Sequence, residues 1–195
     1  MAIRLKDYRM DIHSQYGEDG IIAKILEKRG YPENLHGWWC MDIGAWDGVK
    51  FSNIHALVER GAAAVDVEAD PERFAMLTQT AENPEWDIRP WLYPVGFDNV
   101  SQIMADAVAE KRGEGDPLVL SIDIDGDHAG LLRRCDVMPF RIVVAEWNNR
   151  GDVRQYDPLR AWAADTGYKC VAKTNANLVF VVDSWAADFE EVISP

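Results

Sequence analysis

The stretch that decides the fold is WWCMDIGAWDGVKF, from Trp38 to Phe51. It opens with an apolar run, continues through an acid at Asp42, and breaks at a glycine-containing turn from Gly44 to Gly48 before a helical pattern begins. This order predicts a strand, a tight turn and a helix start. In such an arrangement the backbone can approach a ligand closely, and free N–H groups at the helix start point toward it.

The acids beside this turn restrict the kind of ligand. Asp42 and Asp47 would repel a diphosphate unless a metal intervened, but they would attract an ammonium or sulfonium cation. A nicotinamide site would show the pattern G-x-G-x-x-G, whereas Gly44 and Gly48 are spaced G-x-x-x-G and Trp46 stands where a small residue would be expected. The turn therefore favours a cationic ligand over a dinucleotide.

The composition limits the class of protein. The 195 residues are 48% hydrophobic, which is enough for one domain with a substantial core. Twenty Lys and Arg against 33 Asp and Glu give a net charge of −13, which disfavours binding to nucleic acid or to an anionic membrane. The basic pairs Lys111-Arg112 and Arg133-Arg134 are expected on solvated helix faces. No segment is apolar enough to predict a membrane span.

The cysteines and the N-terminus indicate the cellular compartment. Cys40, Cys135 and Cys170 lack a C-x-x-C spacing and lie in apolar runs, so we expect buried free thiols in a reducing environment. The first ten residues are charged and short of apolar residues, unlike a signal peptide. We therefore expect a cytoplasmic protein. Its oligomeric state stays open, although eight tryptophans could provide an aromatic face for self-association.

Helical and strand patterns alternate along the chain. In order, they predict a helix over 14–29, a strand from 38, a helix over 49–60, a strand over 62–69, a helix over 74–81, an edge strand over 87–96, a helix over 99–111, strands over 118–124 and 141–145, a helix over 156–167, and strands over 168–173 and 178–183. This alternation predicts an α/β fold: a doubly wound, seven-stranded, mostly parallel sheet with helices on both faces and a C-terminal antiparallel hairpin. We treat 1–195 as one domain, with an N-terminal helical cover (1–36), a core (37–184) and an acidic tail (185–195) that the sequence does not place.

Four stretches carry a family resemblance. They are DIGAWDGVKFSN from Asp42, VDVEADPERF from Val65, LSIDIDGD from Leu120 and AEWNN from Ala145. In this order and spacing the chain resembles the class I S-adenosylmethionine-dependent methyltransferases, and within them the FkbM-like group. The resemblance implies a Rossmann-like methyltransferase fold with the strand order 3-2-1-4-5-7-6.

The resemblance also implies where S-adenosylmethionine would bind. Its methionine end would lie beside Asp42, Gly44, Ala45 and Gly48, with Asp42 drawing the ammonium group through water. In a doubly wound sheet the acid that ends the second strand, here Glu68, lies where a ribose diol binds. Its carboxylate could accept hydrogen bonds from both hydroxyls.

The remaining cofactor contacts are less distinctive. The alternative role for Glu68 is that of an acid stabilised by the dipole at the start of the following helix, a role that suits Asp70 better. Ala69 and Asp123 complete the predicted cofactor site. Phe97 could cover the adenine face and Asp98 could accept from its amino group, but the same two residues could equally form a turn and N-cap.

Acids crowd the end of the fourth predicted strand. Asp123, Asp125, Asp127 and His128 fall within six residues, and such crowding is costly without a cation or shared protons. Open α/β sheets bind ligands beyond the carboxyl ends of their strands, so we place the chemistry here. Asp125 or His128 is the expected general base. The alternative for His128 is a solvent-exposed helix start.

A metal could also occupy this region. The resemblance implies that Asp123 and Asp125, with Glu146 and Asn148 after the fifth strand, could hold Mg²⁺ through oxygen ligands. A bound metal could then lower the pKa of the acceptor hydroxyl in place of a general base. The same residues could instead contact substrate or cap helices.

Together these features predict methyl transfer from S-adenosylmethionine to an oxygen of a small-molecule or sugar acceptor, without nucleic acid or membrane partners. The sulfonium is already activated, so the protein mainly has to align the acceptor and keep it deprotonated. The segment from Ser14 to Asp19 would either fold over the cofactor or simply cover the sheet. Two other functions stay open: a metal-dependent, hydroxylase-like protein on the same fold, and a non-catalytic cofactor-binding protein.

Overall fold

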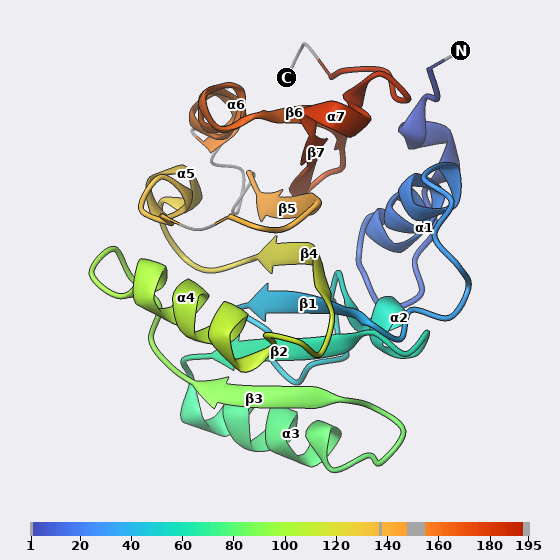
Figure 1. Ribbon diagram of the computed structural model, residues 1–195. Coiled ribbons are helices and arrows are strands. Elements are labelled where there is room, and N and C mark those ends of the chain that lie inside the picture. Colours follow the sequence, from blue (N-terminus) through green and yellow to red (C-terminus); the bar gives the residue numbers. More distant parts are fainter. Residues whose placement is uncertain (1, 137, 148–154, 193–195) are drawn as a thin grey trace.

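The computed structural model describes residues 2–136, 138–147 and 155–192. The elements in chain order are η1 (Leu5–Tyr8), α1 (Glu18–Lys28), β1 (Trp38–Ile43), α2 (His55–Val58), β2 (Ala63–Glu68), α3 (Pro71–Ala81), β3 (Ile88–Leu92), α4 (Val100–Glu110), β4 (Asp116–Ile122), α5 (His128–Leu132), β5 (Ile142–Glu146), α6 (Tyr156–Thr166), β6 (Tyr168–Lys173), β7 (Asn177–Val182) and α7 (Asp183–Ala186). Figure 1 shows these elements as one sheet between layers of helices. In the described part of the chain, no helix is both long and apolar enough to cross a membrane.

The seven strands form a single sheet in the order β3-β2-β1-β4-β5-β7-β6. The pairs β1–β2, β1–β4, β2–β3 and β4–β5 are parallel, whereas β7 is antiparallel to both β5 and β6. The predicted fold class and strand order are therefore confirmed. The chain reverses its direction of travel between β1 and β4, so the carboxyl ends of these two neighbouring strands form the switch point where such sheets bind ligands.

Each face of the sheet has its own hydrophobic core. On one face α4, α5 and α6 pack against side chains such as Met41, Leu120 and Phe180. On the other face α1, α2, α3 and α7 pack against Cys40 and Val119 among others. Figure 1 shows α4, α5 and α6 following one another along one side of the sheet, with α1 and α2 on the opposite side. Alternate side chains of a strand point to opposite faces, so each buried strand contributes to both cores.

The helix expected over 49–60 is much shorter in the structure. Only His55–Val58 is helical, because Phe51, inside the expected helix, has a positive φ (65°), as does Trp46 (54°) in the turn before it. Positive φ is uncommon for residues other than glycine and cannot continue a right-handed helix. The extra turns place Trp46 and Phe51 beside the edge of the sheet described below.

The two ends of the chain are tied together. Trp185 and Phe189 are buried, at 8% and 4% exposure, so the segment that the sequence left unplaced packs into the second core. The backbone of Ile3 pairs with this segment through Ile3 N to Asp188 O (2.8 Å) and Glu190 N to Ile3 O (2.9 Å). Figure 1 shows η1 on the same side of the molecule as α7.

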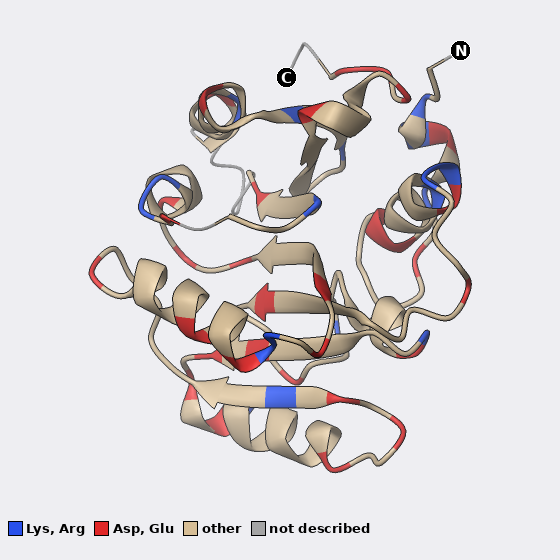
Figure 2. Cartoon of the chain, in the orientation of Figure 1, with Lys and Arg blue, Asp and Glu red and all other residues tan. Residues whose placement is uncertain are grey.

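The expectations for single residues have mixed outcomes. The three cysteines are free thiols, two of them buried and Cys135 half-buried. Arg133 is exposed, as expected of a helix surface, and pairs with Asp165 at 2.9 Å. The expectation for Lys111 was wrong: its side chain is fully buried, with Nζ 3.2 Å from Glu114 and 3.4 Å from Asp87. Figure 2 shows that acidic residues are spread over most elements, while basic residues are few and scattered.

Candidate functional site

A glycine turn after β1 forms the centre of the site. Gly44 has φ of +93°, and a Cβ built on it would lie 1.9 Å from the carbonyl oxygen of Asp123. The amides of Gly44 and Ala45 both donate to Val67 O, at 2.9 and 3.1 Å. The turn is therefore held between β2 and the end of β4, and only glycine fits at this position. Gly48 has a different role, because its α-carbon faces Leu77 of α3.

A cavity of about 630 Å³ opens at this edge of the sheet. Its volume lies within the roughly 300 to 1,000 Å³ that small-molecule sites occupy. Six carboxylates line it, contributed by the ends of β1, β2, β4 and β5 and the residues just after them: Asp42, Glu68, Asp70, Asp123, Asp125 and Glu146. Gly44, Ala45 and Ala69 also line the cavity, whereas Gly48 and His128 do not. The structure thus brings most of the predicted site residues together around one cavity.

Glu68 is fixed by the backbone around it. Its Oε1 accepts from the amides of Ala69 and Asp70, and its Oε2 accepts from the amide of Trp46, each at 2.8 Å. A carboxylate offers about four acceptor positions. Three are filled, so one remains for a ligand rather than the two that the ribose prediction assumed. Asp70 caps α3 by accepting from the amides of Glu72 and Arg73, as the alternative assignment expected.

Asp42 lies below the glycine turn and is only 3% exposed. Burial raises its pKa to about 6, the nearby Asp123 adds to this, and hydrogen bonds from Ser121 and Ser52 oppose it. The Ser52 hydroxyl donates to Asp42 Oδ2 at 3.1 Å. Next to Asp42 in the sheet register stands Asp66, an acid that the sequence analysis did not consider. Burial, and then Asp42, raise the pKa of Asp66 well above its ordinary value.

The ends of β4 and β5 carry the other acids. Asp123 faces the cavity and shares a side-chain hydrogen bond with Glu146; burial raises its pKa, and the neighbouring Asp125 adds to this while the bond to Glu146 opposes it. Asp127 instead caps α5 by accepting from the Gly130 amide at 2.8 Å. Thus only part of the acid cluster faces the cavity.

His128 is buried rather than exposed at the start of α5, so its expected alternative as a solvated residue was wrong. Its Nε2 accepts from the Ile124 amide at 3.2 Å and lies 3.8 Å from Glu146 Oε2. Burial lowers its pKa, which favours the neutral ring that this acceptor role requires. Since His128 holds the backbone after β4 and does not line the cavity, its position suits a structural role better than proton transfer.

Three of the four predicted Mg²⁺ ligands, Asp123, Asp125 and Glu146, line the cavity. Asp123 and Glu146 share a side-chain hydrogen bond. Among the described residues, Asp123, Asp125 and Glu146 do not form a set of three ligand atoms within 4.8 Å of one another. Asn148, the fourth predicted ligand, lies outside the described residues. The Mg²⁺ site therefore stays a prediction without support from the described residues.

The two residues predicted to contact adenine lie outside the cavity. Phe97 and Asp98 are exposed and do not line the cavity. The Phe97 ring instead lies over α5, with the guanidinium of Arg134 5.8 Å from its centre. The loop after β3 leaves the edge of the sheet before it reaches Phe97, and residues nearer the strand end, Tyr93 to Val95, line the cavity.

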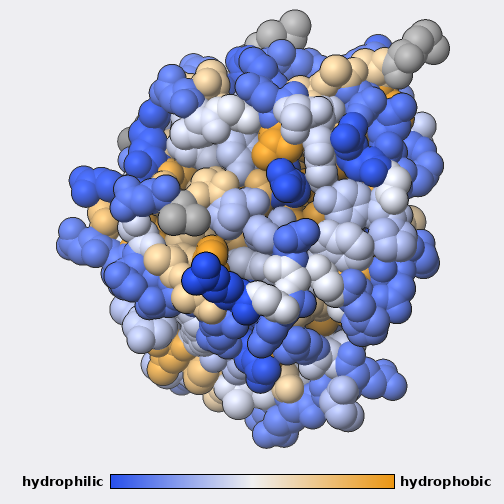
Figure 3. Space-filling model, viewed as in Figure 1, coloured by the Kyte–Doolittle hydropathy of each residue, from blue (hydrophilic) through white to orange (hydrophobic). Residues whose placement is uncertain are grey.

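Two cations and two aromatic rings at the cavity mouth were missed by the sequence analysis. Arg73 stacks over the Trp46 ring at 4.4 Å, and Lys50 lies 5.0 Å from the same ring and 4.9 Å from Phe51. All four side chains line the cavity. The unusual Trp in the glycine turn was the only sequence signal for this group. Gln15, from the segment before α1, also lines the cavity. Figure 3 shows one face of the molecule as mostly hydrophilic with small, separate hydrophobic patches.

Comparisons with known proteins bear on the fold. No protein-family model and no curated protein matches the chain. Solved structures do match: monomeric WbdD, elsewhere described as a bifunctional kinase-methyltransferase, has a TM-score of 0.53 and 19% identity over 83% of this chain and 39% of WbdD. The METTL16 MTase domain gives 0.54 and 14% over 84% of this chain and 66% of that one. The Methanococcus jannaschii fibrillarin pre-rRNA processing protein gives 0.52 and 14% over 78% and 69%.

The chain has the Rossmann-like methyltransferase fold. It spans well under half the length of WbdD. At these identities the likeness establishes the arrangement of helices and strands, and the chemistry has to be argued from the cavity itself.

Proposed function

We propose that the protein is an S-adenosylmethionine-dependent methyltransferase that methylates an oxygen of a small-molecule or sugar acceptor, in the manner of the FkbM-like group. The observation that carries this proposal is the cavity at the carboxyl ends of β1, β2 and β4, where a turn that admits only glycine at Gly44 meets the carboxylates of Asp42 and Glu68. An acid-lined cavity of this size suits a ligand that carries an ammonium and a sulfonium group.

The residues around the cavity fit the three parts of this cofactor. Asp42 would attract the ammonium group, and the one open acceptor position on Glu68 Oε2 would bind a ribose hydroxyl. Tyr93 and Val95, which line the cavity at the end of β3, would contact the adenine in place of Phe97. When bound, S-adenosylmethionine supplies a methyl group on a positively charged sulfur, which an oxygen nucleophile can attack.

Asp125 is the residue that we assign as general base. It lines the cavity and is exposed to it, so its carboxylate can reach a proton on a bound acceptor. The hydrogen-bonded pair of Asp123 and Glu146 lies beside it and would fix the acceptor hydroxyl. His128 would hold the backbone of Ile124 and so keep this loop in place.

The charge of the chain supports a small acceptor. A net charge of −13, with no basic surface run, disfavours nucleic acids and anionic membranes as partners. The two cations at the cavity mouth, Lys50 and Arg73, are stacked on Trp46 within the site, where they could contact an acidic or hydroxyl-rich acceptor. No step of this proposal uses Mg²⁺.

Calorimetric titration of the protein with S-adenosylhomocysteine tests the proposal, with two matched aromatic variants. We expect micromolar binding by the unchanged protein, and binding weaker by about 1 kcal/mol or more in Tyr93→Ala, since an aromatic stacking contact is worth about 1 to 3 kcal/mol. Phe97→Ala, which removes a similarly exposed ring outside the cavity, should bind normally. Weaker binding only in Phe97→Ala would restore the original adenine assignment.

The base assignment needs a separate measurement. Once a methyl acceptor is found, Asp125→Asn should lower kcat by about 10² to 10⁴ without changing the affinity for S-adenosylhomocysteine. An unchanged kcat would remove Asp125 from the mechanism. Failure of the unchanged protein to bind S-adenosylhomocysteine would reject the methyltransferase proposal while leaving the fold as described.

A further inference from the structure

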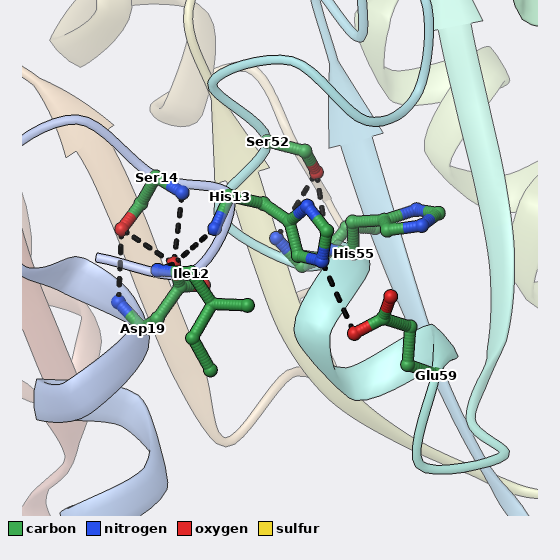
Figure 4. Close-up of polar contacts among 8 residues, drawn as sticks. Ile12, His13, Ser14, Asp19, Ser52, His55 and Glu59 are labelled. Carbon is green, nitrogen blue, oxygen red and sulfur yellow. Dashed lines mark hydrogen bonds and ion pairs between the residues drawn. The ribbon is translucent and has the colours of Figure 1, made fainter. Parts of the chain in front are cut away.

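A second polar cluster lies outside the cavity, between the segment before α1 and helix α2. It consists of His13, His55 and Glu59; Figure 4 shows the His13 imidazole pointing at the Glu59 carboxylate, with His55 beside them. One ligand atom from each residue lies within 4.8 Å of the other two. His13 Nε2 is 3.1 Å from Glu59 Oε2, and the two imidazole rings meet edge to face at 4.6 Å.

The His55 side chain is buried without satisfying its polar atoms. The residue is 1% exposed; the backbone of Gly48 lies close enough to act on its pKa, but neither ring nitrogen makes a hydrogen bond of ordinary geometry with another described residue. Its ring meets both Trp86 and His13 edge to face, at 4.5 and 4.6 Å between ring centres. Buried polar groups are nearly always paired with protein, water or an ion, so this imidazole indicates a missing partner.

His13 is held in position by the backbone on both sides of it. The amides of Ile12, His13 and Ser14 all donate to Oδ2 of Asp19, each at 2.8 Å, as Figure 4 shows. The hydroxyl of Ser14 donates to the same oxygen at 2.8 Å. A loop with three consecutive amides fixed on one carboxylate presents its imidazole with little remaining freedom, which reduces the entropy lost on binding a ligand.

His55 and Glu59 are held by α2. They are four residues apart on one turn of helix, so their side chains lie on the same face. Ser52 fixes the start of this turn by accepting from the amides of Ile54 and His55, at 3.2 and 3.1 Å. The cluster is therefore built from two segments that are far apart in sequence, each held by its own hydrogen bonds.

We propose that His13, His55 and Glu59 bind one divalent transition-metal ion of the Zn²⁺ type. Two imidazoles and a carboxylate are a ligand set for zinc-like ions, whereas Mg²⁺ and Ca²⁺ prefer oxygen ligands throughout. The side chains of His13 and Glu59 are 17% and 43% exposed, which leaves the fourth position to water. Tetrahedral Zn²⁺ with bonds of about 2.0 to 2.1 Å needs ligand atoms roughly 3.3 Å apart; here they lie within 4.8 Å of one another, so they would have to move closer on binding.

This site is distinct from the proposed cofactor cavity, since none of its three residues lines that cavity. Its metal would join the segment before α1 to α2. Gln15, two residues beyond His13, does line the cavity, as does Ser52 at the start of α2. Metal binding would therefore restrict the movement of the two cavity-lining segments that contain Gln15 and Ser52.

The test is equilibrium binding of Zn²⁺ to the full chain, with Mg²⁺ as the comparison ion. We expect one Zn²⁺ per chain and no comparable binding of Mg²⁺. His13→Gln and Glu59→Gln each remove one ligand from the more exposed side of the cluster and should weaken Zn²⁺ binding at least about tenfold, the loss that even outer-shell changes cause. His36→Gln, an exposed histidine outside the cluster, is the matched control and should bind Zn²⁺ normally.

Two further measurements keep the result specific. Zn²⁺ should slow amide hydrogen exchange over residues 11–16 in the unchanged protein but not in His13→Gln. Asp125→Asn should leave Zn²⁺ binding intact, because Asp125 lines the acidic cavity and is not part of the histidine cluster. Zn²⁺ binding that is lost in Asp125→Asn and kept in His13→Gln would overturn the proposal, and so would failure of the unchanged protein to bind Zn²⁺. Neither outcome depends on binding of S-adenosylhomocysteine, so this proposal and the methyltransferase proposal fail separately.

Discussion

The acid-lined cavity and the histidine cluster differ in how their buried polar atoms are paired. Both bury polar side chains, but Glu68 in the cavity accepts three backbone N–H groups at 2.8 Å, whereas His55 in the cluster has no ordinary hydrogen bond among the described residues. A buried polar group without a partner costs about 1 to 3 kcal/mol. Glu68 is therefore stable by itself and ready to bind a neutral hydroxyl, while His55 is stabilised only if something binds to it.

Burial shifts the pKa values of the two sites in opposite directions. It raises the pKa of Asp42 to about 6 and lowers the pKa of His55, so in both places desolvation favours the neutral form. A cationic ligand would favour the ionised form of Asp42 and so lower its pKa again. A neutral imidazole is already the form that ligates metals. The contrast between the two sites leads to four predictions, given from the largest expected effect to the smallest.

Gly44→Ala should be the most damaging change at the cavity. Its Cβ would collide with the carbonyl oxygen of Asp123 at 1.9 Å, so we expect the free energy of unfolding to fall by roughly 4 kcal/mol or more. Gly113→Ala is the matched control, because Gly113 has a similar φ of +88° but no atom within 4 Å of the added Cβ. It should lose only about 1 to 2 kcal/mol, measured by urea denaturation. Equal losses in both variants would mean that the turn is not constrained by β4.

Glu68→Gln tests whether the cavity acid is held by the backbone. An amide at this position turns an NH₂ group toward at least one of the three N–H donors, so we expect a loss of about 1 to 3 kcal/mol in unfolding free energy in the absence of any ligand. The control is Glu72→Gln, an exposed acid in the first turn of α3, which should change stability by less than about 1 kcal/mol. If only ligand affinity changed, the backbone contacts of Glu68 would be unimportant for folding.

Asp42→Asn should change the pH dependence of stability. The pKa of Asp42 is raised in the folded chain, so its protonated form contributes stability below about pH 4, and that contribution is lost as the pH rises through about 6. Asparagine cannot ionise, and we expect the variant to be more stable than the unchanged protein by about 1 to 3 kcal/mol at pH 7.5 and by less at pH 5.5. Urea denaturation at both pH values measures this, with Asp98→Asn as an exposed control. A constant difference between the two pH values would contradict the prediction.

His55→Phe should have the smallest effect, and its sign should depend on metal. With chelator present, an apolar ring removes two unsatisfied nitrogens, so the thermal midpoint should stay within a few degrees of that of the unchanged protein or rise above it, a change of about 1 kcal/mol or less. With Zn²⁺ present, only the unchanged protein should gain stability by binding the ion. If Zn²⁺ stabilised both proteins equally, the ion would be binding elsewhere.

The histidine cluster also shows where sequence reasoning stops. His13 and His55 are 42 positions apart and carry no spacing motif, so only the packing of the segment before α1 against α2 brings them together. His128, in contrast, stood in a conspicuous acidic run and was expected to be a base, but the structure buries it behind the loop. Clustering of polar residues in the sequence therefore did not predict which histidines lie beside other potential metal ligands.

The sequence by itself determined the order of helices and strands, the glycine turn after β1, the acids at the strand ends, and the strand order through family resemblance. The order of elements, the glycine turn and the strand-end acids follow from local periodicity and from residue types that suit particular backbone conformations, whereas the strand order came only from the resemblance. The tertiary structure alone decided the length of α2, the burial of Lys111, which part of the loop after β3 faces the cavity, and the meeting of His13, His55 and Glu59. Each of these depends on contacts between segments distant in the chain, and no local pattern records such contacts.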